Sequence, residues 1–202
     1  MSKNTKQILI ILAVALLFCI IGGAAALGGA GLIFERFKDN VSTDPEKVRQ
    51  TAHEFMNYEL PSGYSEQVGM DFIIYKMVLV GSSGDFDNPD EPTITKPIIF
   101  LAHFDSEDLT PDQMAKQMQQ SVERQSGSGG LKLKVVETRD VSINGKDAQL
   151  TVSEGSDSNG SDYRQWVTAF PGKTGLIIIL IQGRINQWDD ATFNDFLSSI
   201  SF

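Results

Sequence analysis

Two histidines are the side chains of this chain best suited to acid–base chemistry, because histidine titrates closest to neutral pH. They are His53 and His103. His103 follows Ile99 and Leu101 at the alternate spacing of a strand and precedes the acidic stretch 105–108. This spacing predicts an inward-facing, hydrogen-bonded histidine. The alternative is a small-ligand-binding or hydrolytic domain that uses His103 and the nearby acids.

Patterns typical of nucleophilic or zinc enzymes are absent from the sequence. No serine stands in the five-residue nucleophile elbow of the hydrolases. The single cysteine, Cys19, lies in an apolar N-terminal run, which excludes both an internal disulfide and a cysteine-based zinc site. We therefore expect a protein that is not an enzyme and that has no catalytic residue, no cofactor and no metal site.

Two acidic segments nevertheless offer the oxygen ligands that calcium prefers. The first holds Asp85, Asp87, Asp90 and Glu91, and the second holds Asp157, Asn159, Gly160 and Asp162. Neither supplies the late bidentate glutamate of an EF-hand. Ordinary solvated loops are the prediction, and calcium binding is the alternative.

The stretch Gly172-Lys173-Thr174 has the residue types of a phosphate-binding loop. Such a loop needs a glycine five residues before its Gly-Lys pair and a helix after it. Val167 occupies the glycine position, and a β-branched run of strand length follows. The stretch therefore predicts a turn between two buried strands. The run 176–181 is also far shorter than the roughly 20 residues of a membrane span.

The N-terminal segment 8–34 carries no charged residue. As a helix it would be about 40 Å long, more than the roughly 30 Å hydrocarbon core of a bilayer requires. After a short tail, residues 1–7, we therefore expect one transmembrane helix, with the bilayer as its partner. The alternative is a cleaved signal peptide with small residues at 24–26, but hydrophobicity resumes after them.

Small residues recur every four positions in this segment, at Gly22, Ala26 and Ala30. Such a strip lets two membrane helices approach closely, so self-association is a hypothesis. The alternative is that glycine and alanine are simply common in such helices. Lys3 and Lys6 favour a cytoplasmic N-terminus, whereas Arg36 and Lys38 on the other side of the segment favour the opposite orientation. We expect the first, which would place the remaining chain outside the cytoplasm.

Net charge restricts the class of partner. The whole chain carries a formal charge of -9, and residues 41–202 hold 13 basic and 24 acidic residues, a charge of -11. Nucleic-acid binding needs a basic face that neutralises phosphates. We therefore expect no nucleic-acid partner and a protein partner that the sequence does not identify.

After a tether, residues 35–42, one soluble domain is predicted over residues 43–202. Thr43 or Asp44 caps an opening helix that ends near Glu59. Thr110, with Gln113 completing a capping box, starts a second helix. Asn144-Gly145 predicts a tight hairpin turn. The remaining predicted elements are strands at 71–80, 97–104, 131–135, 148–152, 163–170 and 176–183, and a closing helix after Asp189 and Asp190.

These elements predict an α+β fold, an α/β/α sandwich. Hairpin-linked strands in the middle of the chain make the sheet mainly antiparallel, with about six or seven strands. Several strands are apolar on both faces, so helices are expected on both faces of the sheet. One transmembrane helix precedes this domain.

The hairpin "VSINGKDAQLTV", the tryptophan strand "YRQWVTAF" and the closing "FNDFLSSI" resemble the PsbP-like fold group. That group includes the PsbP subunit of photosystem II, a Ran-binding nuclear-import factor and bacterial anchored proteins of the DcrB type. The resemblance covers residues 43–202 and rests on structural motifs, so no functional residue is carried over. It implies a binding or assembly factor without a shared catalytic site. We expect a single-pass membrane-anchored, non-catalytic protein-binding or assembly module.

Overall fold

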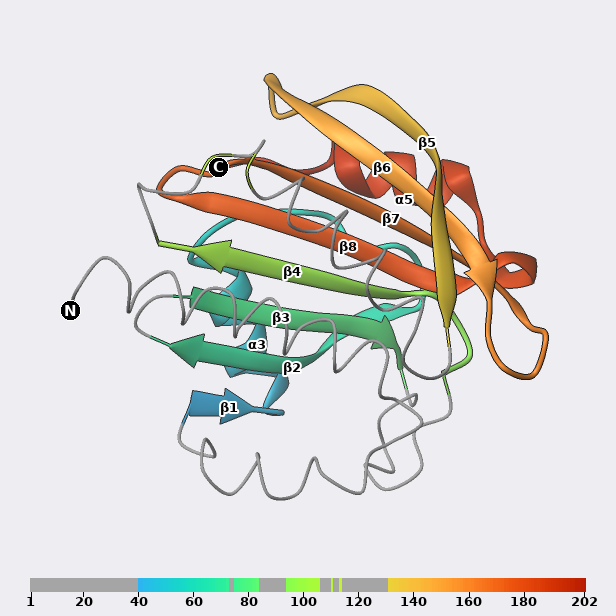
Figure 1. The fold of residues 1–202 in the computed structure, drawn as a ribbon. Coiled ribbons are helices and arrows are strands. Elements are labelled where there is room, and N and C mark those ends of the chain that lie inside the picture. The colour runs from blue at the N-terminus through green and yellow to red at the C-terminus, as the bar shows by residue number, and fades with distance from the viewer. Residues whose placement is uncertain (1–39, 73–74, 84–93, 106–109, 111–112, 114–130) are drawn as a thin grey trace, which may run out of the picture.

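The computed structural model describes residues 40–72, 75–83, 94–105, 110, 113 and 131–202. These residues form one antiparallel sheet with two α-helices (Figure 1). The strands are β1 (Val41–Ser42), β2 (Tyr64–Phe72), β3 (Tyr75–Ser82), β4 (Ile98–Phe104), β5 (Lys132–Ile143), β6 (Lys146–Ser156), β7 (Asp162–Pro171) and β8 (Leu176–Arg184). The helices are α3 (Pro45–His53), the short 3-10 helix η3 (Ile185–Gln187) and α5 (Asp190–Ser198).

The eight strands lie in the order β1-β2-β3-β4-β8-β7-β6-β5, and every neighbouring pair is antiparallel. β4 and β8 lie at the centre, and all seven residues of β4 are buried. Runs of β-branched and aromatic residues suit such a strand because both of its faces are covered. At the two ends of the sheet lie the two-residue β1 and the 12-residue β5.

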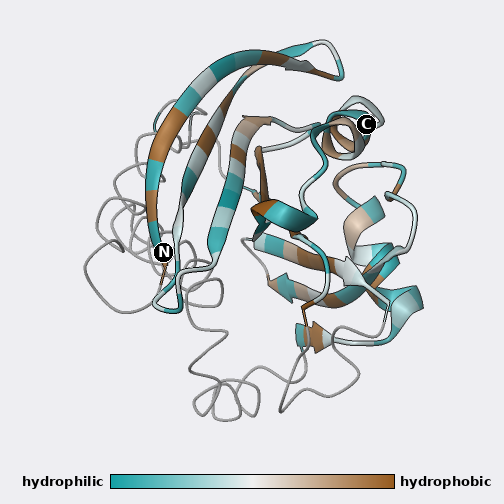
Figure 2. Ribbon diagram, turned by 90° about the vertical axis from the view of Figure 1, so that its right-hand side faces the viewer, coloured by the Kyte–Doolittle hydropathy of each residue, from teal (hydrophilic) through white to brown (hydrophobic). Residues whose placement is uncertain are grey.

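Both described α-helices, α3 and α5, lie on one face of the sheet. They are behind the strands in Figure 1 and to the right of them in Figure 2. We call this face the helix side. Val48 and Ala52 of α3, and Phe193 and Phe196 of α5, join one apolar cluster with inward residues of the strands. Burial of this face is the main force that holds the helices on the sheet, because the helices themselves are short.

The opposite face of the sheet is also apolar. Phe100, Val167, Ile178 and Leu180 belong to a second buried cluster there. Within the described residues no helix lies on this face. The prediction of helices on both faces is therefore supported for the helix side alone.

The helix predicted to start at Thr110 falls, except for Thr110 and Gln113, outside the described residues. Those two residues make the predicted capping box, each backbone N–H donating to the other side chain at 3.3 Å.

The predicted count of about six or seven strands is wrong, because the sheet has eight. The predicted strand at 71–80 is in fact the junction of a hairpin, in which Phe72 pairs with Tyr75. The apolar stretch from Phe72 to Tyr75 contains no glycine, proline, asparagine or aspartate, so the sequence gives no turn signal at the reversal. The opening helix also ends earlier than Glu59. It stops at His53, because Asn57 leaves to exchange backbone hydrogen bonds with Ser201.

Several predicted turns and caps are confirmed. Asn144 and Gly145 have φ of 50° and 72°, as a type I′ hairpin turn requires. Asp44 caps α3 and Asp189 caps α5, each through a side-chain oxygen.

The predicted transmembrane segment 8–34, and with it the strip of Gly22, Ala26 and Ala30, lies outside the described residues. No helix within the described ranges is long and apolar enough to cross a membrane.

A β-bulge in β5 decides which side chains face the helices. Leu133 and Val135 pair with Gly155 and Ser153, but Glu137 pairs with Val152, so Val136 is an extra residue in β5. One extra residue moves every later side chain to the other face. Leu133 therefore packs on the face opposite the helices, whereas Ile143 packs on the helix side. Figure 2 shows the long β5–β6 hairpin curving toward the helix side.

Candidate functional site

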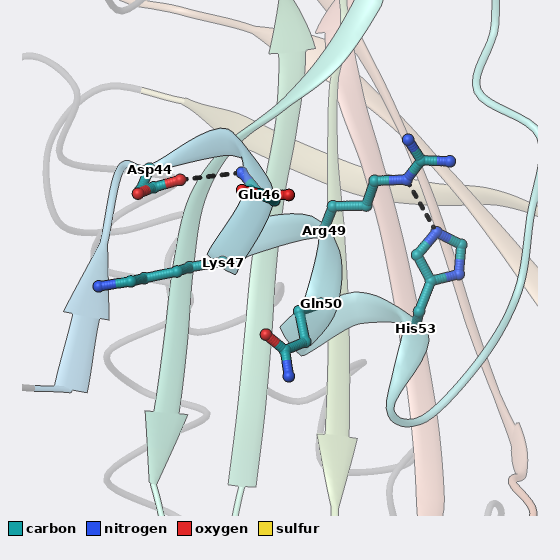
Figure 3. Close-up of a pocket in the computed structure, with 6 residues that line it drawn as sticks. All are labelled: Asp44, Glu46, Lys47, Arg49, Gln50 and His53. Carbon is teal, nitrogen blue, oxygen red and sulfur yellow. Dashed lines mark hydrogen bonds between the residues drawn. The ribbon is translucent and has the colours of Figure 1, made fainter.

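The exposed side of α3 forms an open depression with charged walls (Figure 3). Val48 and Ala52 anchor the helix on the sheet, which turns the remaining side chains toward solvent. The depression is lined by Asp44, Glu46, Lys47, Arg49, Gln50 and His53. Both signs of charge occur within two helical turns, which suits a polar contact surface better than an enclosed catalytic pocket.

His53 is held by its neighbours rather than free to accept a proton from a substrate. Arg49 Nε donates to His53 Nε2 at 3.4 Å, and His53 Nδ1 lies 3.0 Å from Asn57 Oδ1. Because Nε2 accepts, Nδ1 carries the proton and donates to Asn57. The ring also stacks on Tyr58, with centroids 5.7 Å apart. These contacts tie the end of α3 to the segment that follows it.

Tyr58 continues this connection to the sheet. Its hydroxyl donates to Glu66 Oε1 at 3.1 Å, and its ring meets Phe196 of α5 edge to face. Burial of the phenol, and then the negative charge of Glu66, raise the pKa of Tyr58 above its usual range. Tyr58 therefore remains a neutral hydrogen-bond donor in the folded protein. This arrangement supports a structural role at the junction of α3, β2 and α5.

A charged cluster joins α3 to the β2–β3 hairpin. Lys76 Nζ lies 2.5 Å from Glu54 Oε2 and 2.8 Å from Asp71 Oδ1. Desolvation is the largest single influence on the pKa of Lys76 and lowers it, but the hydrogen bonds and charges of Asp71 and Glu54 together raise it. The ammonium is already satisfied by two carboxylates, so this cluster is not available as a Schiff-base lysine.

His103 is a structural histidine at the end of β4. It is 7% exposed, and its Nε2 lies 2.7 Å from the backbone oxygen of Thr174, to which it donates. Phe55 stacks on the imidazole with centroids 5.6 Å apart. Thr174 belongs to the turn between β7 and β8, where Gly172 N–H donates to Gly175 O at 3.1 Å. The predicted turn at Gly172-Lys173-Thr174 is thus confirmed, and its backbone oxygen fixes His103.

The second of the two acidic segments is a closed turn. Asp157 Oδ1 accepts from the backbone N–H groups of Asn159 and Ser161 at 2.9 and 2.8 Å, and Ser156 Oγ donates to Asp162 Oδ1 at 2.8 Å. Gly160 takes a φ of 79° there. Within the described ranges no three histidine, cysteine or acidic side chains converge as a metal site. The first acidic segment, at 85–91, lies outside the described residues.

The outer edge of β5 is one of the two ends of the described sheet. β5 ends the strand order, and no other described strand pairs with its outer side. Val136, the bulged residue, is 56% exposed, more than any other large hydrophobic side chain that the structure describes. Sequence reasoning did not single it out. The adjacent pair Val135–Val136 was the available signal, because it breaks the alternation of the strand.

Comparison with solved structures places this fold near two others. The structure is similar to the solution structure of cyanobacterial PsbP (CyanoP) from Synechocystis sp. PCC 6803, with 10% identity, a TM-score of 0.45 and coverage of 73% of this chain and 92% of that one. It is also similar to LpqN, involved in cell envelope biogenesis of Mycobacterium tuberculosis, with 12% identity, a TM-score of 0.37 and coverage of 72% and 82%. A PsbP protein is thus among the structures that this chain resembles, as the sequence predicts.

No family model matches the sequence, and no curated protein matches it either. The likeness to the two solved structures concerns the fold alone. A shared fold does not by itself assign a function to this chain.

Proposed function

We propose that this chain is a single-pass membrane-anchored, non-catalytic protein-binding or assembly module whose partner binds along the outer edge of β5. The observation that carries the proposal is this edge: 12 residues long, without a described neighbour, and bearing the exposed Val136. An unpaired edge strand offers a row of N–H and C=O groups to an incoming strand.

The sign of charge changes along β5, from basic before the bulge to acidic after it. Lys132 and Lys134 precede the bulge and are exposed, whereas Glu137 and Asp140 follow it and are exposed too. Lysines and a bulge also limit indiscriminate pairing between edges. A partner strand with acidic residues opposite the lysines and basic residues opposite Glu137 and Asp140 would complement it.

The chemistry of the histidines supports a function without catalysis. His103 donates its Nε2 proton to a backbone oxygen, and His53 is engaged through both ring nitrogens. A general base needs a free nitrogen within reach of a substrate proton, and His103 is only 7% exposed, so its other ring nitrogen is shielded from solvent. The contacts of these two rings are those of structural residues.

Anchoring at a membrane is the part of the proposal that rests on sequence. The uncharged segment 8–34 would span the bilayer once, and Lys3 and Lys6 would keep the N-terminus in the cytoplasm. The domain would then lie outside the cytoplasm.

Cysteine labelling tests this placement. In a Cys19→Ser background, the substitution Ser158→Cys places a thiol in the exposed β6–β7 turn. This thiol should react with a membrane-impermeant maleimide in intact cells. Reaction only after lysis would contradict an extracytoplasmic domain.

Site-specific photo-cross-linking tests the binding surface. A photoreactive residue is placed at Thr138, on the exposed part of β5, in the full-length chain in its native membrane. The same residue at Lys173, in the exposed β7–β8 turn, is the matched control. The proposal predicts one protein adduct from position 138 that is absent from position 173. Equal adducts at both positions, or none at 138, would contradict it.

A further inference from the structure

Two neighbouring side chains on the edge strand β5 carry opposite charges on the same face. Lys134 pairs with Glu154 of β6, and Glu137 pairs with Val152. Val152 belongs to the helix-side cluster, and alternate residues of a strand share a face, so Lys134 and Glu137 both lie on the helix side. Because Val136 is the extra residue of the bulge, only one paired residue separates the two charges along the strand.

Neither charge is neutralised within the described residues. Lys134 stands opposite Glu154, but the carboxylate of Glu154 binds Arg164, with oxygen and nitrogen 2.7 Å apart. Neither Lys134 nor Glu137 makes an ion pair with another described residue. Both side chains are exposed. They are therefore available to a partner at the outer edge of β5.

The strand that best answers these two charges is β5 itself in the reverse direction. A two-fold axis makes every contact occur twice, since residue i of one copy faces residue j of the other and the reverse. With the axis at Val135, and with Val136 again counted as the extra residue, Lys134 of each copy faces Glu137 of the other. Opposite charges directly across an antiparallel pair stabilise it. The helix sides of both copies then lie on the same face of one continuous sheet.

The same charges disfavour the neighbouring registers. An axis through Lys134 places two ammonium groups opposite each other, and an axis through Glu137 does the same with two carboxylates. Like charges directly opposite destabilise a strand pair. In the favoured register Lys132 faces Arg139, but the guanidinium of Arg139 is turned away from the outer edge, 4.7 Å from the centre of the Trp166 ring on β7. The charges thus select one register.

We propose that the partner at the edge of β5 is a second copy of this chain, paired antiparallel with Lys134 of each copy opposite Glu137 of the other. The inference rests on the proposed function, because it names the occupant of the same edge. Val136, which is 56% exposed, lies beside the axis in both copies and adds apolar contact there. Edge lysines and a bulge restrict other pairings, which gives this one specificity. The proposed membrane anchor would raise the effective concentration of the two copies, so a short interface suffices.

Two differently tagged copies of the full-length chain, expressed together in the native membrane, test this pairing. Both copies carry the photoreactive residue at Thr138. We expect an adduct of twice the mass of the chain that contains both tags. An adduct with a different protein, and none with both tags, would overturn the self-pairing and leave the proposed function standing. No adduct at all would contradict the proposed function, and the self-pairing with it.

Charge exchange tests the register. Lys134→Glu alone, or Glu137→Lys alone, places like charges opposite each other in a pair of identical copies, and each should lower the yield of the two-tag adduct about tenfold. One copy with Lys134→Glu and one with Glu137→Lys should restore the yield to within about twofold of the wild type, because both opposite-charge contacts return. Lys173→Glu makes the same exchange in the exposed β7–β8 turn and, as the matched control, should leave the yield unchanged.

Both exchanged side chains are exposed and lie outside the two buried clusters, so the exchanges leave the core intact. A chain that carries Lys134→Glu and Glu137→Lys together should pair with itself as the wild type does, which is a second measurement of the same register. The proposal is overturned if neither the mixed copies nor this double variant gives more adduct than the single variants. It is also overturned if each single exchange leaves the yield at the wild-type level.

Discussion

The guanidinium of Arg139 lies over the ring of Trp166, 4.7 Å from its centre, although β6 separates their strands. The bulge at Val136 makes this contact possible. Without the extra residue, regular alternation from Leu133 would turn Arg139 to the face opposite the helices. One exposed valine thus determines where a positive charge is buried.

Deletion of Val136 should therefore disrupt more than a surface contact. It moves either Leu133 or Ile143 away from its buried position, and loss of one such side chain costs about 2–5 kcal/mol. Urea unfolding followed by tryptophan fluorescence measures the loss. Val136→Thr, which keeps the residue count and the β-branch, should stay within about 0.5 kcal/mol of the wild type. A deletion variant as stable as the wild type would show that the bulge does not fix the register.

The N-cap of α5 predicts a dependence of stability on pH. Thr192 Oγ1 donates to Asp189 Oδ2 at 2.7 Å and Ala191 N–H to Oδ1 at 3.1 Å, and these hydrogen bonds lower the pKa of Asp189. A carboxyl whose pKa is lower in the folded state stabilises it above the unfolded pKa. This stabilisation is lost as the pH falls through the folded pKa.

We therefore expect Asp189→Asn to reduce the loss of thermal stability between pH 6 and pH 3, measured as Tm. Asp195→Asn, at an exposed position of the same helix, is the control and should follow the wild-type curve more closely. Superimposable curves for Asp189→Asn and the wild type would show that the Asp189 carboxylate does not contribute to the pH dependence of Tm.

Phe196 should anchor α5 on the sheet. The side chain is buried in the helix-side cluster and meets the ring of Tyr58 edge to face, with centroids 5.8 Å apart. Phe196→Ala should lower the free energy of unfolding by about 3–5 kcal/mol, since it leaves a cavity between helix and sheet. The exposed Asn194→Ala on the same helix should change it by less than about 0.5 kcal/mol. Similar effects of the two substitutions would argue against tight packing of α5.

The hairpin tip offers a test of backbone conformation. Gly145 has a φ of 72° with open space around the position of a Cβ, so a substitution meets backbone strain but no clash. Gly145→Ala should destabilise the domain by about 1–2 kcal/mol, and Gly145→Asn by less, because asparagine tolerates this region better. Urea unfolding measures both. A stabilising Gly145→Ala would contradict the assigned turn.

Local signals predicted the caps and the hairpin turn correctly, because Asp44, Asp189 and Asn144 act on neighbours within a few residues. The same reasoning placed His103 inside the sheet. It failed where the outcome depends on distant partners. The reversal between Phe72 and Tyr75 lies in an unbroken apolar run, and the early end of α3 depends on Ser201, far along the chain.

The direction of the Arg139 side chain and the edge position of β5 were hidden for a related reason. Arg139 shows no signal in the sequence that separates it from the exposed charges of β5, since its direction depends on the bulge. That β5 is an edge follows from the strand order, which a sequence without its pairing partners does not fix.

The most direct test of the central claim is the yield of the adduct from position 138 when Val136 is changed. Val136→Lys places a charge on the bare edge and should reduce the yield at least about tenfold, because edge lysines oppose strand addition. Val136→Thr should leave the yield within about twofold of the original, since it keeps the strand propensity. An adduct that forms equally well with Val136→Lys would contradict partner binding at the edge of β5.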